Sequence, residues 1–106
     1  MTTAAYHYRW QATAHRVLGE LLTEAEEHRL PPLMWTLAPT GALTGEASVL
    51  DGRTEQRAAI KAWADHLGAN VTETERVDGR VSLHAFISVA GTRVGALRAE
   101  LYPDTD

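Results

Sequence analysis

The amino-acid sequence predicts an α+β protein, a two-layer sandwich in which an antiparallel sheet carries its helices on one face. Three observations support this prediction: a long hairpin pattern over residues 79–102, two amphipathic helical patterns upstream of it, and connections short enough for antiparallel pairing. The expected order of elements is α-β-β-α-β-β-β. The length of 106 residues predicts a single domain over residues 1–106, with a polar tail at 103–106.

The first helix is expected over residues 4–29. Apolar residues recur there at spacings of three and four, the period of one face of an α-helix. That apolar face carries Trp10, Ala14, Val17, Leu18, Leu21, Leu22 and Ala25. The helix should end at Leu30, because the residue before a proline is pushed out of the helical region and Pro31 follows. The polar and acidic residues off this face are expected to form a solvated surface.

A short hairpin should follow the first helix. Residues 33–38 predict a strand with Trp35 on its inward face, and residues 43–50 predict the partner strand. Residues 39–42 between them have the composition of a turn. Gly45 interrupts the second strand and is expected to mark a β-bulge.

The second helix should begin within residues 51–54. Its apolar residues repeat at i, i+3, i+4 and i+7, and they are Ile60, Trp63, Ala64 and Leu67. Gly68 follows at the position where a left-handed residue commonly ends a helix. Residues 70–77 alternate and are rich in β-branched side chains, which predicts an edge strand whose charged residues discourage further pairing.

The C-terminal hairpin over residues 79–102 should turn at residues 90–91. A two-residue loop at this turn pairs Ile87 with Val94 and sets the register of the two strands. In that register, one face of the hairpin is apolar on both strands. We expect the two helices to cover that apolar face.

The same register defines a candidate interaction site on the opposite face of the hairpin. It places His84, Phe86, Leu97 and Leu101 together there. Because helices on one side leave this face open, its apolar members would form an exposed patch, which is typical of an interface. We therefore expect a non-enzymatic protein-interaction or accessory regulatory protein that acts through this face, as a homodimer or with another protein.

Composition argues against several classes of function. The net charge is −4 and no basic block is present, which argues against nucleic acid as the partner. The chain has no cysteine, which excludes disulfides, thiol catalysis and cysteine-based zinc sites. The apolar runs are far shorter than the ~20 residues of a membrane span, and no signal-peptide pattern is found at residues 1–10. We therefore expect a cytoplasmic protein without membrane contact.

The polar residues do not form a recognisable catalytic or metal-binding pattern. The five histidines are spaced too widely to supply the three or four ligands of a zinc site. Ser82 and His84 are neighbours on one strand face, but no acid is placed to orient the histidine. We therefore predict no metal, no other cofactor and no catalytic residue. Enzymatic activity stays open, and a non-enzymatic role is favoured.

One alternative is a small-ligand-binding module or minor enzyme. Its pocket would be lined by Trp10, Trp35 and Trp63, which is a large aromatic content for so short a chain. Filling the core is the commoner use of such residues.

A second alternative is a nucleic-acid-binding accessory protein. Arg53, Arg57 and Lys61 share one face of the second helix at i, i+4 and i+8, and they would contact the phosphates.

The central part of the chain resembles small uncharacterised proteins of high-GC actinobacteria. The resemblance covers roughly residues 30–68. It is carried by Leu30-Pro31-Pro32, Trp35, Gly41, Gly45, Arg57-Ala58-Ala59, Trp63 and Leu67-Gly68. Such proteins are often found beside regulators or in mobile-element regions and have no established activity. The resemblance therefore implies an accessory or regulatory role and no catalytic residues.

Overall fold

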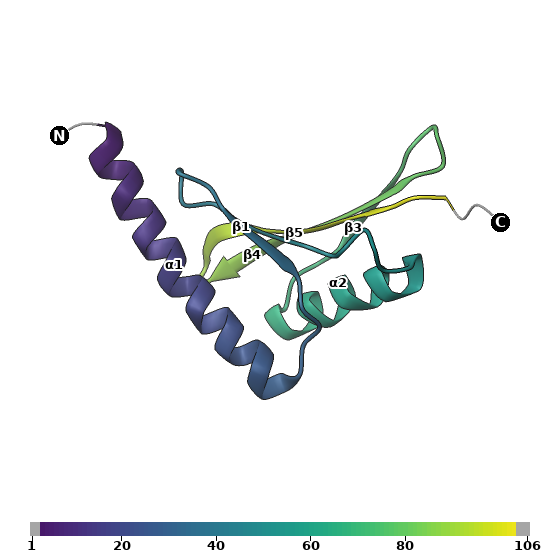
Figure 1. Cartoon of the computed structure of the whole chain (residues 1–106), viewed down its shortest axis with the longest axis horizontal. Helices are drawn as coiled ribbons and strands as arrows, with labels where there is room; N and C mark the ends of the chain where they lie inside the picture. Colours follow the sequence, from purple (N-terminus) through teal and green to yellow (C-terminus); the bar gives the residue numbers. More distant parts are fainter. Residues whose placement is uncertain (1–2, 104–106) are drawn as a thin grey trace.

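The computed structural model describes residues 3–103 and shows the predicted α+β fold with the predicted order of elements (Figure 1). The elements are α1 (Thr3–His28), β1 (Met34–Leu37), β2 (Leu43–Glu46), α2 (Arg53–Leu67), β3 (Thr72–Glu75), β4 (Val81–Val89) and β5 (Thr92–Leu101). The tail predicted at 103–106 lies outside the described residues after Pro103. No helix among residues 3–103 is both long and apolar enough to cross a membrane.

The five strands form one sheet in the order β1-β2-β5-β4-β3. Three of the four strand pairs are antiparallel as expected: β1 with β2, β5 with β4, and β4 with β3. The pairing of β2 with β5 is parallel, so the sheet is mixed and the prediction of a wholly antiparallel sheet is wrong. The reason is that β2 and β5 are not consecutive: α2, β3 and β4 intervene and return the chain so that β5 runs in the direction of β2.

The helices pack against one face of the sheet and share a single hydrophobic core with it. α2 supplies Ile60 and Trp63, which are both almost fully buried. The indole Nε1 of Trp63 donates a hydrogen bond of 2.7 Å to the carbonyl oxygen of Pro31 and so ties α2 to the segment that follows α1. Gly68 ends α2 in the left-handed conformation, at φ 66°, as predicted.

The long helix α1 ends at a left-handed residue, Arg29, whose φ is 54°. The amide of Leu30 then donates to the carbonyl oxygen of Ala25 at 2.9 Å, which is the hydrogen-bonding pattern of a Schellman cap. Among residues 4–28 of α1, whose burial the structure describes, only Ala14 and Leu21 are fully buried in the core. Figure 1 shows the N-terminal turns of α1 extending beyond the strands of the sheet.

Gly45 lies within regular pairing and not at a bulge, so this prediction is wrong. It pairs with Trp35 on β1 and with Leu97 on β5. A Cβ atom at Gly45 would lie 2.9 Å from the ring of Trp35. The glycine is therefore required because the six-membered ring of Trp35 occupies the space that a side chain at this position of β2 would need.

The bulge of this sheet lies instead in the β4–β5 hairpin. The turn is at the predicted residues, because Ala90 and Gly91 have positive φ angles of 51° and 80°. After two cross-strand pairs the register shifts next to Ile87, whose partner is Gly95 and not Val94. The predicted register is therefore wrong by one residue for the rest of β5, and a shift of one residue exchanges the two faces of that strand.

Candidate functional site

Within residues 3–103, both helices lie on one face of the sheet and none covers the other, which we call the outer face. It is formed by the side chains that alternate with the buried ones along each strand. These are Met34 and Thr36 of β1, Thr44 and Glu46 of β2, Arg93, Ala96, Arg98 and Glu100 of β5, Ser82, His84, Phe86 and Ser88 of β4, and Thr72 and Thr74 of β3. The outer face is thus rich in threonine and carries both signs of charge.

The structure divides the interaction patch that the sequence predicted. His84 and Phe86 lie on the outer face as expected, and Phe86 is 46% exposed. Leu97 and Leu101 lie on the opposite face, where both are 0% exposed in the core. The prediction is wrong for these two leucines because the bulge beside Ile87 turns their strand by one residue.

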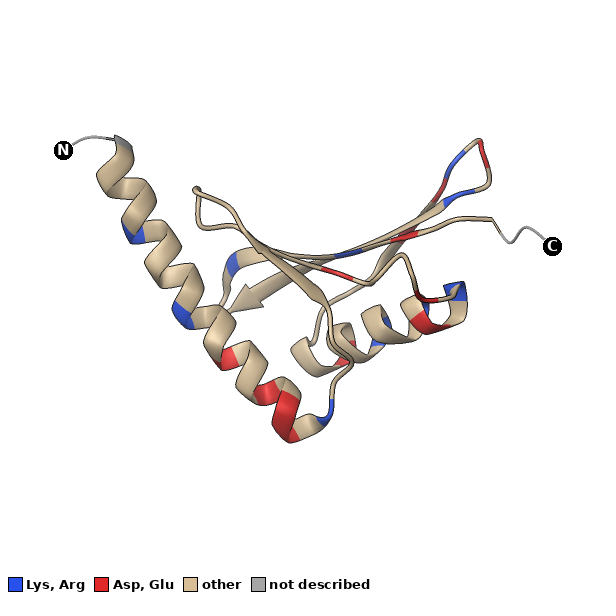
Figure 2. Cartoon of the chain, in the orientation of Figure 1, with Lys and Arg blue, Asp and Glu red and all other residues tan. Residues whose placement is uncertain are grey.

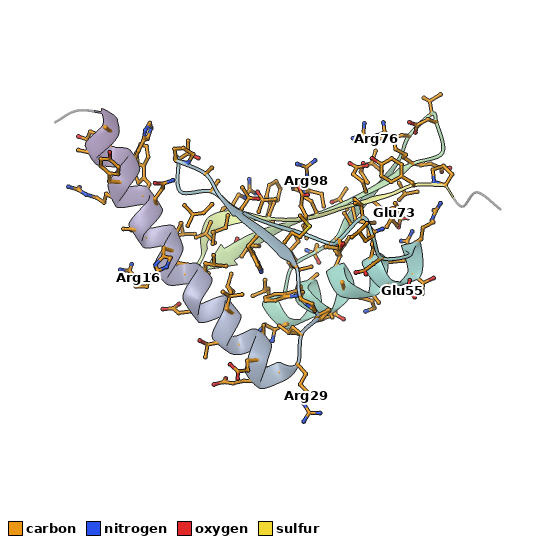
Figure 3. All side chains as sticks on the ribbon, viewed as in Figure 1. Arg16, Arg29, Glu55, Glu73, Arg76 and Arg98 are labelled. Atoms are coloured by element: carbon orange, nitrogen blue, oxygen red, sulfur yellow. The ribbon has the colours of Figure 1, made fainter. Side chains whose placement is uncertain are left out.

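In place of the leucines, two arginines join His84 and Phe86, and we call these four residues the aromatic–basic cluster. The guanidinium carbon of Arg93 lies 3.5 Å from the centroid of the Phe86 ring. The His84 ring meets Phe86 edge-on, with 4.6 Å between centroids. Arg98 is the cross-strand neighbour of His84. Figure 3 shows the Arg98 side chain pointing away from the side of the sheet that α2 covers. The cluster is therefore an aromatic surface bordered by two cations.

A shallow hollow of about 360 Å³ adjoins the cluster. Phe86 and Arg93 form one side of it, Thr40 and Thr44 another, and the backbone beside the bulge its floor. The hollow is wide open to solvent and is a surface depression of the outer face, so it can accept a protruding side chain but does not enclose a small molecule.

Among the described residues, the two cations of the aromatic–basic cluster have no carboxylate partner, whereas four other cations do. Within 4 Å of a carboxylate lie Arg57, Lys61, Arg76 and Arg80. Neither Arg93 nor Arg98 forms such a pair within residues 3–103. Glu46 is the cross-strand neighbour of Arg98 on β2, but the two do not form an ion pair. The cluster therefore presents two positive charges that a partner could neutralise.

The far end of the outer face is occupied by an internal polar network. Arg76 donates a hydrogen bond of 2.9 Å from Nε to the hydroxyl of Ser82 and lies 3.7 Å from the Glu100 carboxylate. The Ser82 hydroxyl in turn donates to Glu100 at 2.9 Å. Because these groups form hydrogen bonds and an ion pair with one another, this end of the face has fewer unpaired polar groups for a partner than the aromatic–basic cluster has.

The structure does not gather the three tryptophans into one pocket. Trp35 and Trp63 pack edge to face in the core, with 5.4 Å between ring centroids. Trp10 is 43% exposed and lies against Gly41 of the β1–β2 turn, where it stacks on Tyr6 at 5.9 Å. Trp63 is thus buried in the core with Trp35 packed against it, and Trp10 is not part of this group.

The predicted phosphate contacts on α2 are already occupied by partners within the protein. Arg57 donates two hydrogen bonds, of 3.0 and 2.9 Å, to the carboxylate of Glu73. These bonds raise the pKa of Arg57 and hold the pKa of Glu73 below its ordinary value. Lys61 pairs with Asp65 at 2.8 Å. Arg53 donates to the carbonyl oxygen of Tyr102 at 3.0 Å. Two of the three cations of this row are therefore paired with carboxylates, and Arg53 is held by a neutral carbonyl oxygen.

Two histidines and a glutamate meet where α1 and α2 end, a contact that the sequence analysis did not anticipate. His66 Nε2 lies 3.6 Å from the carboxylate of Glu24, and the rings of His28 and His66 are 4.8 Å apart. Within the described residues no three histidine, cysteine, aspartate or glutamate side chains are arranged to hold a metal ion. The contact joins the two helices.

Comparison with protein-family models, curated proteins and solved structures found no match to this chain.

Proposed function

We propose that this chain is a non-enzymatic protein-binding module whose outer face binds an acidic segment of another protein. The observation that carries the proposal is the aromatic–basic cluster: Arg93 lies over the half-exposed Phe86 and Arg98 beside His84, and neither arginine has a carboxylate partner among residues 3–103. Arginine and aromatic residues contribute most of the binding energy in many protein interfaces. A module of this kind has no chemistry of its own and would serve as an accessory or regulatory protein.

The charges around the cluster favour an acidic protein segment over a nucleic acid. Carboxylates of Glu46 and Glu100 lie on the same face, close to Arg98 in the sheet. These carboxylates would repel a continuous phosphate backbone, and the whole chain is net negative. A peptide can instead place one or two carboxylates at the arginines and neutral residues elsewhere. The charge pattern therefore fits a partner with isolated acidic residues.

The hollow beside Phe86 suggests the second feature of the partner. An apolar side chain seated there would cover the exposed part of Phe86 while neighbouring carboxylates pair with Arg93 and Arg98. Burying the ring would also strengthen its cation–π contact, because desolvated contacts of this type are stronger than exposed ones. We therefore expect a partner motif in which an apolar residue is flanked by aspartate or glutamate.

The experiment is a selection from a random peptide library on the wild-type chain, followed by titration of the selected peptides. Two matched variants are titrated in parallel: Arg98→Glu inside the cluster and Arg29→Glu at the end of α1. Both make the same change in net charge at an exposed arginine. We expect selected peptides to be acidic, and to bind Arg98→Glu at least tenfold more weakly than Arg29→Glu.

Several results would contradict the proposal. The outer face is not the site for acidic segments if the selected peptides contain no acidic residues. The same conclusion follows if acidic peptides bind Arg98→Glu and Arg29→Glu equally well. A parallel titration with single-stranded oligothymidine covers the nucleic-acid alternative. If the oligonucleotide binds and Arg98→Glu abolishes its binding, the face is a nucleic-acid surface and not a protein-binding one.

A further inference from the structure

We propose that the free edge of β4 binds an extended acidic segment of another protein as an additional strand of the sheet. The site is the edge beside Phe86 and Ser88, where β4 continues beyond the end of β3. It is built from backbone donors and acceptors, whereas the outer face is built from side chains. The inference therefore goes beyond the proposed function, and either can hold without the other.

The first observation is that β3 covers only part of β4. β3 has four residues and β4 has nine. Their pairing begins with Val81 opposite Glu75 and ends with His84 opposite Thr72. Beyond this point, residues 85–89 of β4 have β5 on one side, and the strands that the structure describes leave their other side unpaired. We call this stretch the open edge.

The hydrogen bonds of the β3–β4 hairpin determine which backbone groups face the open edge. The amide of Arg76 donates to the carbonyl oxygen of Arg80 at 2.8 Å, so the backbone groups of Arg80 point toward β3. Because this direction alternates along a strand, the N–H and C=O groups of Phe86 and Ser88 point the same way. Within residues 3–103, neither of the two forms a backbone hydrogen bond to a turn or loop. The open edge therefore presents two donors and two acceptors, which is the pattern that an added strand pairs with.

The open edge also lacks the features that discourage strand addition. β3 forms the other part of the same edge, and its sequence TETE carries two glutamates, whose charges oppose pairing with a further strand. Residues 85–89 contain no charged residue and no proline, and two of them are β-branched. Figure 2 shows this end of β4 without charge. The sequence of the open edge thus permits the pairing that the sequence of β3 opposes.

The surroundings of the open edge define the side chains of the added segment. Successive side chains of a strand point to opposite sides of the sheet. Those on the outer face would lie beside Phe86, over which Arg93 is held without a carboxylate partner among residues 3–103. Those on the helix side would meet a hollow of about 240 Å³ between the edge and the end of α2, with Leu67 and Ala69 in its wall. The segment should therefore alternate acidic and apolar residues.

The same charges argue against a second copy of this chain as the occupant. Edge-to-edge pairing of two copies would bring two Arg93 guanidinium groups to one surface, because each lies over the Phe86 ring of its own edge. The open edge contains no acidic residue that could neutralise them. A foreign segment with carboxylates pairs with the same backbone groups and removes this repulsion.

Hydrogen exchange of single amides tests the pairing directly. The probe is a blocked hexapeptide of alternating aspartate and valine, titrated to about 5 mM into the ¹⁵N-labelled full chain. We expect the amides of Phe86 and Ser88 to exchange rapidly in the free protein and at least about threefold more slowly with the peptide bound. The amides of Ala85 and Ile87 point to β5, so they should exchange slowly in both states and serve as internal controls.

Two substitutions at one position separate the backbone from the side chain. Ser88→Pro removes the N–H that faces the open edge and leaves the bonds to β5 in place, an arrangement in which sheets tolerate proline. Ser88→Ala keeps the N–H. With folding of both confirmed by circular dichroism, we expect Ser88→Pro to weaken peptide binding at least about fivefold and Ser88→Ala to leave it unchanged. If Ser88→Pro does not fold, the exchange of the wild-type amides decides the question.

Five results would each overturn the proposal. The first is no binding of the probe, and the second is binding that leaves the exchange of Phe86 and Ser88 unchanged. The third is equal binding of a peptide with the same side chains and methylated backbone nitrogens, which cannot donate to the edge. The fourth is equal binding of an alternating lysine–valine peptide, which would contradict the acidic character of the occupant. The fifth is a dimer of the unliganded chain in sedimentation velocity that Ser88→Pro abolishes.

The variant Arg98→Glu separates this site from the outer face. We expect it to bind the probe as the wild type does, because Arg98 lies beside His84 and not at the open edge. If Arg98→Glu loses the probe and Ser88→Pro keeps it, the peptide lies on the outer face. That result would support the proposed function and overturn strand addition, so the two proposals fail separately.

Discussion

Replacing Leu97 by alanine should destabilise the fold far more than replacing its neighbour Phe86, although the turn of the hairpin alone predicts that both lie on the same open face. In the structure Leu97 is 0% exposed and points into the core, whereas Phe86 is 46% exposed on the outer face. Comparing the loss of stability in the two variants therefore tests whether the strand register of β5 is correct. The bulge beside Ile87 is the feature under test.

The magnitude follows from the surroundings of each side chain. Leu97 lies between Gly45 on β2 and Ala85 on β4, which are too small to fill the space that its side chain vacates. A cavity should therefore persist, and we expect Leu97→Ala to cost about 3–4 kcal/mol, in the upper half of the usual range for this substitution. Phe86→Ala removes a half-buried phenyl ring and one exposed cation–π contact. Together these losses should lower the free energy of unfolding by about 1–2 kcal/mol.

Urea denaturation followed by tryptophan fluorescence is a suitable assay, because Trp35 and Trp63 both lie in the core and report its loss. Leu50→Ala is the matched control, since Leu50 is 93% exposed and the same substitution should change the stability by less than about 0.5 kcal/mol there. If Leu97→Ala behaves like the control while Phe86→Ala costs more than about 3 kcal/mol, the register described here is incorrect.

Two further predictions concern other contacts of the sheet. Gly95→Ala should destabilise the protein by about 3 kcal/mol or more, as severe overpacking does. The reason is that a Cβ atom there would lie 2.7 Å from the backbone carbonyl carbon of Leu43. Thermal unfolding measures this loss, and a melting temperature equal to that of the wild type would contradict the close approach of β2 to β5. Two hydrogen bonds from Arg57 hold the pKa of the Glu73 carboxyl below its ordinary value. The pair therefore stabilises the folded state at any pH above the ordinary pKa of glutamate, and this stabilisation is lost as the pH falls through the lowered pKa of the folded state. Arg57→Gln should therefore raise the pKa of Glu73 toward its ordinary value in a carboxyl-carbon NMR titration, and an unchanged titration curve would show that the pair does not persist in solution.

The order and type of the elements could be predicted from the sequence because each depends on local chemistry. Pro31 predicts the end of the first helix to within two residues, Gly68 ends the second, and the left-handed residues Ala90 and Gly91 form the hairpin turn. These signals lie within a few residues of the feature they determine, so no knowledge of tertiary structure was needed to use them.

The register of β5 was predicted wrongly, although its own sequence contains the signal. Leu97, Ala99 and Leu101 alternate with Arg98 and Glu100, so the pattern of β5 alone places the leucines in the core. Counting from the turn places them outside. A conflict between these two rules indicates an extra residue in one strand, which is the definition of a bulge.

The candidate site was therefore predicted only in its β4 half. His84 and Phe86 depend on the alternation of one strand, which the sequence shows directly. Arg93 pairs with Ser88 on the turn side of the bulge, whereas Arg98 reaches this face only because the bulge has turned the rest of β5. The parallel approach of β2 to β5 was also hidden, because it joins segments that are about fifty residues apart and no local pattern specifies it.

The central position of β5 has a consequence for how the protein is made. β2 is synthesised about fifty residues before its partner β5, and at ~5–20 residues per second this interval lasts roughly 3 to 10 seconds. During that time the β1–β2 hairpin has no third strand, and an isolated two-stranded hairpin is at best marginally stable in water. The outer face, to which both halves of the chain contribute, can form only after β5 has left the ribosome. A nascent chain interrupted before Thr92 should accordingly be unable to recognise any partner of this face, however long it is allowed to fold.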